Sequence, residues 1–102
     1  MPRERLPNRR PCETAEFLFE GVGWTATRSR YRDGRLAEIF LIGPKIGPGQ
    51  RIAAHDAAIV ASMALQHGVS ADKLRSAMLR SPTGAPAGVV AHALDLVEGD
   101  AS

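Results

Sequence analysis

A segment dense in glycine and proline, GPKIGPG at residues 43–49, divides the chain into two halves of different character. Residues 14–42, which precede it, carry many of the aromatic and β-branched side chains that favour strands. The residues that follow it carry apolar side chains at helical spacing. Strands followed by helices predict an α+β fold, in which the helices pack on one face of an antiparallel sheet.

Three strands are expected in the first half, at residues 14–20, 24–31 and 36–42. Gly21, Val22 and Gly23 are expected to form the first turn. The Asp-Gly pair at 33–34 predicts a type I′ turn, whose two central residues both need positive φ. The three strands would then form an antiparallel meander.

Three helices are expected in the second half, which gives the element order βββααα. The first covers residues 50–67 and should end at Gly68, since glycine is favoured just after a helix. Ser70 is expected to cap the second helix. The third covers residues 87–97, where apolar residues recur at i, i+3, i+4 and i+7.

The first helix is apolar around most of its circumference. Two apolar stripes lie on opposite sides, one of Ile52, Ile59, Val60 and Met63 and one of Ala54, Ala58, Ala61 and Leu65. A narrow polar strip lies between them, formed by Arg51, His55, Ser62 and Gln66. A helix with this pattern is expected to be buried, here between the sheet and the other two helices.

Asp56 lies within the stripe of larger side chains, where an unpaired carboxylate would be costly to bury. Arg28 and Arg30 share one face of the second strand, because they are two residues apart. We therefore predict a structural ion pair between Asp56 and either arginine across the helix–sheet interface. A role for this carboxylate in a binding site is the alternative.

The third strand is apolar on both faces, although the helices can cover only one of them. The other face needs a second cover, which could be the N-terminal arm or another protein chain. Pairing of two copies about a two-fold axis is the commonest way to bury such a face. A homodimer is therefore expected.

The length of 102 residues allows one hydrophobic core. We expect an extended basic arm at residues 1–13, one domain at 14–98 and a disordered tail at 99–102. The basic start is not followed by the apolar stretch of a secretory signal, and no apolar run approaches the length that spans a bilayer. A cytoplasmic protein without membrane contact is expected. The single cysteine, Cys12, excludes an internal disulfide.

No catalytic constellation, metal site or cofactor is expected. The three histidines do not have a metal-ligand spacing such as HxxxH, and no serine lies in a GxSxG motif. Catalysis by the isolated chain is therefore not expected.

The positive charge is concentrated in the first half. Residues 1–51 carry ten Lys/Arg and six Asp/Glu, for a net charge of +4, while residues 52–102 carry a net charge of −2. Nearly all of these cations are arginines, whose planar guanidinium suits phosphate and carboxylate groups. A nucleotide, a nucleic acid or an acidic protein surface would each fit this half, and a solvated face is the simplest alternative.

The loop at 43–49 leads into the N-terminus of a helix, where free N–H groups and the helix dipole favour anions. The candidate anion- or nucleotide-binding residues are Lys45, Gly47, Gly49, Arg51, Arg28 and Arg30. The alternative interpretation of this loop is a plain turn between a strand and a helix.

Several segments together resemble the TSCPD domain. They are RLPNRRPCET at residues 5–14, DGRLAEIFL at 33–41, Lys45, DAAIVASMALQHGV at 56–69 and PAGVVAHAL at 86–94. This domain occurs near the C-terminus of cobalamin-dependent ribonucleotide reductases and as short stand-alone bacterial proteins. The resemblance covers about residues 5–97. The tetrad that names the family contains a cysteine, whereas the corresponding stretch here, RSPTG at 80–84, has none.

The resemblance implies a role in deoxyribonucleotide biosynthesis, as an accessory or regulatory domain that binds a nucleotide, a phosphate or a ribonucleotide reductase chain. Ribonucleotide reduction itself needs a radical cysteine, a redox cysteine pair and a large barrel. One cysteine in 102 residues cannot provide these. The alternative function is a small nucleic-acid-binding protein that uses the arginine-rich half.

Overall fold

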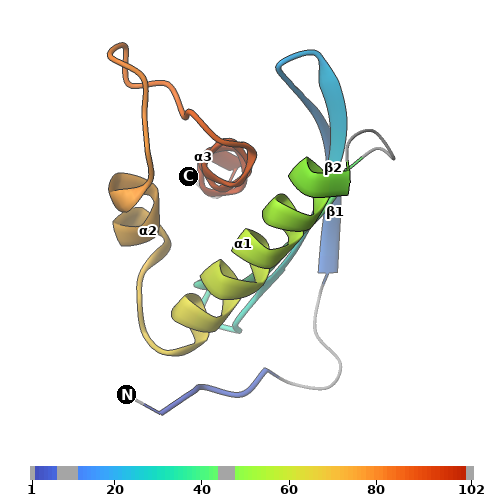
Figure 1. Cartoon of the computed structure of the whole chain (residues 1–102). Helices are drawn as coiled ribbons and strands as arrows, with labels where there is room; N and C mark the ends of the chain where they lie inside the picture. Colours follow the sequence, from blue (N-terminus) through green and yellow to red (C-terminus); the bar gives the residue numbers. More distant parts are fainter. Residues whose placement is uncertain (1, 7–11, 44–47, 101–102) are drawn as a thin grey trace.

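The computed structural model describes residues 2–6, 12–43 and 48–100 and confirms the βββααα order (Figure 1). Three antiparallel strands form one sheet in the order β1-β2-β3. The elements are β1 (Cys12–Phe19), β2 (Val22–Arg30), β3 (Leu36–Ile42), α1 (Pro48–Gln66), α2 (Ala71–Ala77) and α3 (Val89–Asp100). Residues 99 and 100, which were expected to belong to a disordered tail, thus form the end of α3.

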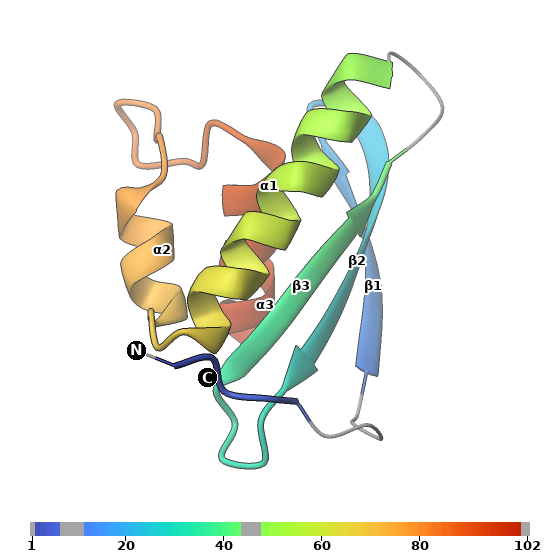
Figure 2. The ribbon, with the colours of Figure 1, turned by 60° about the horizontal axis from the view of Figure 1, so that its bottom comes forward.

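The helices lie on one face of the sheet, as Figures 1 and 2 show. Helix α1 runs along β3, while α3 lies beside α1 over the β1–β2 hairpin and α2 is the outermost. The His92 ring of α3 stacks on Phe17 of β1 with ring centroids 5.3 Å apart. The opposite face of the sheet is not covered by any described element.

The two hairpin turns differ from the expected ones. The β1–β2 turn is formed by Glu20 and Gly21, which both have positive φ (52° and 77°), as a type I′ turn requires. In the β2–β3 loop the Tyr31 N–H donates to the Arg35 carbonyl at 2.9 Å, and only Gly34 has positive φ (94°). The type I′ prediction at 33–34 was therefore wrong, because the hairpin closes around a three-residue loop.

The core lies between the sheet and the inner sides of α1 and α3. It is formed by Trp24, Ala26, Leu36, Ile39 and Leu41 of the sheet, Ala54, Ala58, Ala61 and Leu65 of α1, and Val90, Ala93, Leu94 and Val97 of α3. The small alanine side chains allow the α1 backbone to approach the sheet closely. Burial of α1 on all sides was a wrong prediction, because α3 lies beside α1 and leaves its far side exposed.

The polar strip of α1 faces the free edge of β3. The buried Ser62 hydroxyl accepts from the Ile39 N–H and donates to the Ile39 carbonyl, both at 2.9 Å. The Gln66 side chain donates to the Ala37 carbonyl at 3.2 Å. An edge strand leaves alternate backbone groups unpaired, and α1 supplies their partners.

The first part of the predicted arm contacts the C-terminal end of α1 and the β2–β3 hairpin. The Glu4 N–H donates to the Gln66 carbonyl at 2.7 Å, and the Tyr31 hydroxyl donates to the Glu4 carbonyl at 2.9 Å. The Glu4 carboxylate pairs with Arg35 at 3.0 Å. Residues 7–11 of the arm lie outside the described residues, and a second cover for the sheet stays a prediction.

An ion cluster holds the connection between α2 and α3 in place. Arg80 donates to both Asp95 carboxylate oxygens at 2.9 Å and to the Gly84 carbonyl at 3.2 Å. Arg75 donates to the same carboxylate at 2.9 Å. The hydrogen bonds from Arg80 are the largest cause that lowers the pKa of Asp95 from 3.8 to about 2, and the hydrogen bond from Arg75 contributes less. Partial burial of the carboxylate opposes the shift.

Replacing Asp95 with asparagine should lower the free energy of unfolding by about 1–2 kcal/mol at pH 7. A carboxyl group with a lowered folded-state pKa contributes stability above its ordinary pKa and loses it as the pH falls through the folded value. The difference between wild type and Asp95→Asn should therefore shrink as the pH falls through 3.8 and vanish only below pH 2. Urea unfolding at several pH values measures it, and a difference independent of pH would contradict the assignment.

Candidate functional site

The structure describes only part of the predicted anion site. Lys45 and Gly47 lie outside the described residues, while Gly49 and Arg51 are exposed in the first turn of α1. Arg28 instead contacts Glu13 of β1 at 2.7 Å. Anion binding at this loop stays a prediction.

The predicted ion pair of Asp56 is not formed. Asp56 is exposed on the side of α1 that faces away from the sheet. Arg28 contacts Glu13, while Arg30 donates to the Val97 carbonyl at 2.8 Å and lies 3.5 Å from Glu98. The helical wheel correctly grouped Asp56 with the larger apolar residues, but that stripe is the exposed one.

These residues form a mostly apolar surface that we call the outer face of α1, consisting of Ile52, Asp56, Ile59, Val60 and Met63. The four apolar side chains are 37–66% exposed. Their spacing of i, i+7, i+8 and i+11 places them on one side of the helix. In Figure 1 helix α1 lies in front of the sheet. Scattered exposed apolar residues are common, but a contiguous group marks an interaction surface.

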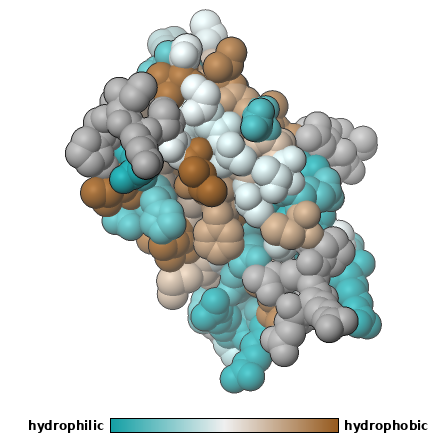
Figure 3. Space-filling model, turned by 90° about the vertical axis from the view of Figure 1, so that its right-hand side faces the viewer, coloured by the Kyte–Doolittle hydropathy of each residue, from teal (hydrophilic) through white to brown (hydrophobic). Residues whose placement is uncertain are grey.

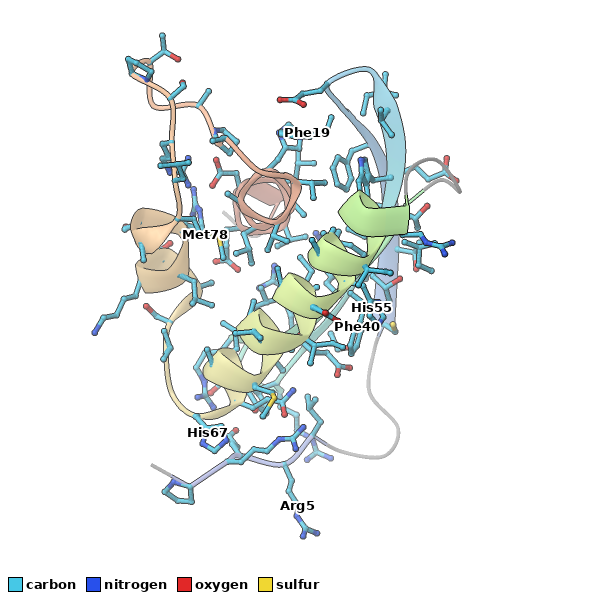
Figure 4. The ribbon with its side chains drawn as sticks, viewed as in Figure 1. Arg5, Phe19, Phe40, His55, His67 and Met78 are labelled. Atoms are coloured by element: carbon cyan, nitrogen blue, oxygen red, sulfur yellow. The ribbon has the colours of Figure 1, made fainter. Side chains whose placement is uncertain are left out.

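A shallow hollow of about 330 Å³ connects the outer face of α1 to the end of β3. Leu41, Ile42, Arg51, Ile52 and His55 line it. Ile42 is 65% exposed, which extends the apolar surface onto the edge strand. Figure 4 shows His55 on the side of α1 that faces the sheet.

A larger cavity, which we call the hairpin pocket, lies between the β1–β2 turn, the first half of α1 and the α2–α3 connection. Its volume is about 640 Å³, and Phe19, Val22, Trp24, Ala53, Ala57, Met78 and Val89 are among its lining residues. Figure 4 shows Phe19 on the hairpin side and Met78 on the α2 side. Among the described residues, no Lys or Arg lines it, and Glu20 is the one charged residue of the lining. The described lining of the pocket therefore suits an apolar group better than a phosphate.

Trp24 is held against the sheet end by the close approach of Gly43. A β-carbon built on Gly43 would lie 2.5–2.9 Å from three carbons of the indole ring. Only glycine therefore fits at this position while Trp24 keeps its place in the pocket wall. The sequence showed Gly43 only as part of a breaker-rich loop, and its contact with Trp24 needed the fold.

The uncovered face of the sheet is more mixed than the outer face of α1. Figure 3 shows hydrophobic residues interspersed with weakly polar and hydrophilic ones on this side of the molecule. Leu18 is 70% exposed there, while Thr14 and Thr27 bring their hydroxyls to 3.4 Å across β1 and β2. This face is less apolar than the outer face of α1.

Among the described residues, no group of three or more His, Cys, Asp or Glu side chains is placed to hold a metal ion. Cys12 is exposed at the start of β1. Within the same described ranges, no helix has the length and apolar character to cross a membrane.

Comparison with known proteins relates the chain to one class of enzyme. It is 37% identical over 71 residues to the vitamin B12-dependent ribonucleotide reductase of Bradyrhizobium diazoefficiens, covering 70% of this chain and 6% of that protein. It is 37% identical over 67 residues to the enzyme of the same name from Agrobacterium fabrum, covering 66% of this chain and 5% of that protein.

No protein-family model and no solved structure matches the chain, so membership of the TSCPD family stays a prediction. The chain spans 5–6% of the length of the curated relatives that it matches. Most of this chain is thus related to a short region of vitamin B12-dependent ribonucleotide reductases.

Proposed function

We propose that this chain is an accessory domain of the ribonucleotide reductase type, which docks on a reductase polypeptide through the outer face of α1. The observation that carries the proposal is the exposed apolar surface of Ile52, Ile59, Val60 and Met63 on a helix whose opposite side forms the core. In the relatives, the related region is part of a far longer chain, so a reductase polypeptide is its natural neighbour.

The arginines support docking on a protein over binding of a nucleotide or nucleic acid. Many of the described guanidinium groups are engaged within the chain, namely those of Arg3, Arg28, Arg30, Arg35, Arg75 and Arg80. A phosphate would have to compete with these contacts. The fold thus engages four of the nine arginines of the first half, namely Arg3, Arg28, Arg30 and Arg35.

The aromatic residues support the same choice. Trp24 and Tyr31 are the aromatic side chains of β2 and its following loop, and each is only 8% exposed. Proteins that bind single-stranded nucleic acid stack bases on exposed aromatic rings. Trp24 instead lies in the core, and Tyr31 donates its hydroxyl to Glu4. Neither forms a stacking platform.

The proposal is tested by titrating the chain with the vitamin B12-dependent ribonucleotide reductase of its own organism, using isothermal titration calorimetry. The wild-type chain should bind, and Val60→Asp should bind at least about 30-fold more weakly, because a charge replaces an apolar contact at the interface centre. Val60 is 66% exposed, so the substitution should leave the fold intact.

Leu18→Asp is the matched control, because Leu18 is 70% exposed on the uncovered face of the sheet. It should bind like the wild type. Loss of binding in Leu18→Asp but not in Val60→Asp would move the docking surface to the sheet. Absence of binding by the folded wild-type chain would contradict the proposed function.

A further inference from the structure

We infer that the docking surface continues from the outer face of α1 into the hairpin pocket, and that its partner is a basic amphipathic segment. This segment places one apolar side chain in the pocket and a Lys or Arg beside Asp56. The inference rests on the proposed function, because it describes the chemistry of the surface that the reductase polypeptide would present.

The hairpin pocket and the outer face of α1 are parts of one surface. Ala53 and Ala57 line the pocket. Ala53 is one turn before Asp56 on α1, and Ala57 is one turn before Val60, so each alanine neighbours an outer-face residue at i+3. Both alanines are exposed and short, which leaves no side-chain barrier between the two parts.

The pocket is built for an apolar group. Its volume of about 640 Å³ falls in the range of about 300–1,000 Å³ of pockets that bury an organic group. Its wall combines the aromatic ring of Phe19 with Trp24 and the flexible thioether of Met78, a residue type that adapts to irregular shapes. A leucine or phenylalanine side chain from a partner would be surrounded on three sides.

Two carboxylates lie on the surface formed by the outer face of α1 and the hairpin pocket, while the one described cation near it, Arg51, lines the hollow beside β3. Asp56 lies in the middle of the outer face, and Glu20 lies at the pocket rim. Both are exposed, and neither forms an ion pair with another described residue. A partner that covers them must offer positive charge or leave two carboxylates dehydrated without partners.

The same charges argue against a second copy as the occupant. A two-fold contact centred on the outer face of α1 would bring the Asp56 carboxylate of each copy towards the other. The chain as a whole carries a net charge of +2, which by itself would attract acidic partners. A preference for a basic partner must therefore arise locally, from Asp56 and Glu20.

Two synthetic amphipathic peptides with identical leucine positions test the inference, one with lysine and one with glutamate at every polar position. Trp24 is the only tryptophan of the chain and lines the pocket, so its fluorescence reports on pocket occupancy. The Leu–Lys peptide should bind at least about 10-fold more tightly than the Leu–Glu peptide and shift the Trp24 emission. Asp56→Lys should reduce or reverse this preference.

Ala57→Leu should fill the pocket and abolish the emission shift. Ala77→Leu, at an exposed position of α2 that does not line the pocket, is the control and should respond like the wild type. Equal or tighter binding of the Leu–Glu peptide would overturn the inference. So would self-association in sedimentation experiments that Ala57→Leu abolishes, because a second copy would then occupy the surface.

The experiments distinguish failure of this inference from failure of the proposed function. If Val60→Asp abolishes binding to the reductase while Ala57→Leu and Asp56→Lys leave it unchanged, docking through α1 stands and the basic, pocket-anchored partner is refuted. If all three substitutions weaken reductase binding and the peptides show the lysine preference, both are supported.

Discussion

Replacing Ser62 with alanine should lower the free energy of unfolding by about 2–4 kcal/mol, because two buried backbone groups lose their partner at once. The Ser62 hydroxyl is the hydrogen-bond partner of both the N–H and the carbonyl of Ile39 on the edge strand. Ser62 is 4% exposed, so water cannot replace the hydroxyl without a rearrangement of α1. Removal of this single oxygen atom should therefore weaken the packing of α1 against β3.

Ser76→Ala is the matched control, since the Ser76 hydroxyl donates to the Asp72 carbonyl at 2.9 Å but lies exposed on α2. Its effect should stay below about 0.5 kcal/mol. Urea unfolding followed by circular dichroism measures both variants. Equal stability of Ser62→Ala and wild type would show that α1 does not complete the edge of β3.

Replacing Leu94 with alanine should destabilise the fold by about 2–5 kcal/mol, the range measured when a buried leucine leaves a cavity. Leu94 is fully buried at the centre of α3. Its side chain belongs to the core shared with the sheet and α1. The rigid β-strands on one side and α1 on the other limit how far the site can collapse.

Leu96→Ala provides the same change on the same helix at a residue that is 40% exposed. Its cost should be below about 1 kcal/mol, because little apolar area leaves water there. Thermal unfolding of the two variants compares the two sides of α3 directly. Similar losses in both variants, or a larger loss in Leu96→Ala, would mean that α3 packs through a different face.

Local chemistry allowed several elements to be predicted from the sequence. The bounds of β3 are the predicted ones, because Gly34 and Gly43 flank a run that is apolar except for Glu38. Ser70 caps α2 by accepting from the Lys73 N–H, and Gly68 has the positive φ of 97° expected after a helix. Such signals depend on a few neighbouring residues and need no knowledge of the tertiary fold.

The orientation of α1 could not be predicted in this way. Helical spacing shows which residues share a side of a helix, but two apolar stripes leave open which of them faces the core. The alanine stripe is buried because it lets α1 lie close to β3, where Ser62 and Gln66 reach the strand edge. The mistaken choice of stripe produced the mistaken Asp56 pair.

The candidate site was missed for a related reason. The hairpin pocket combines residues from β1, β2, α1 and the α2–α3 connection, which only the fold brings together. One signal was present in the sequence, namely a carboxylate at Asp56 within an apolar stripe. An apolar stripe with a charge at its centre is also typical of a docking surface. On that interpretation the Asp56 carboxylate needs no buried partner within the chain.

Docking through the outer face of α1 is tested most directly by NMR that follows the methyl groups of the chain while the reductase of the same organism is added. We predict that the methyl signals of Ile52, Ile59 and Met63 on the outer face of α1 will shift or broaden. The signal of Leu18 on the uncovered face of the sheet should stay in place. Perturbation of the Leu18 signal with unchanged α1 methyl signals would contradict docking through α1.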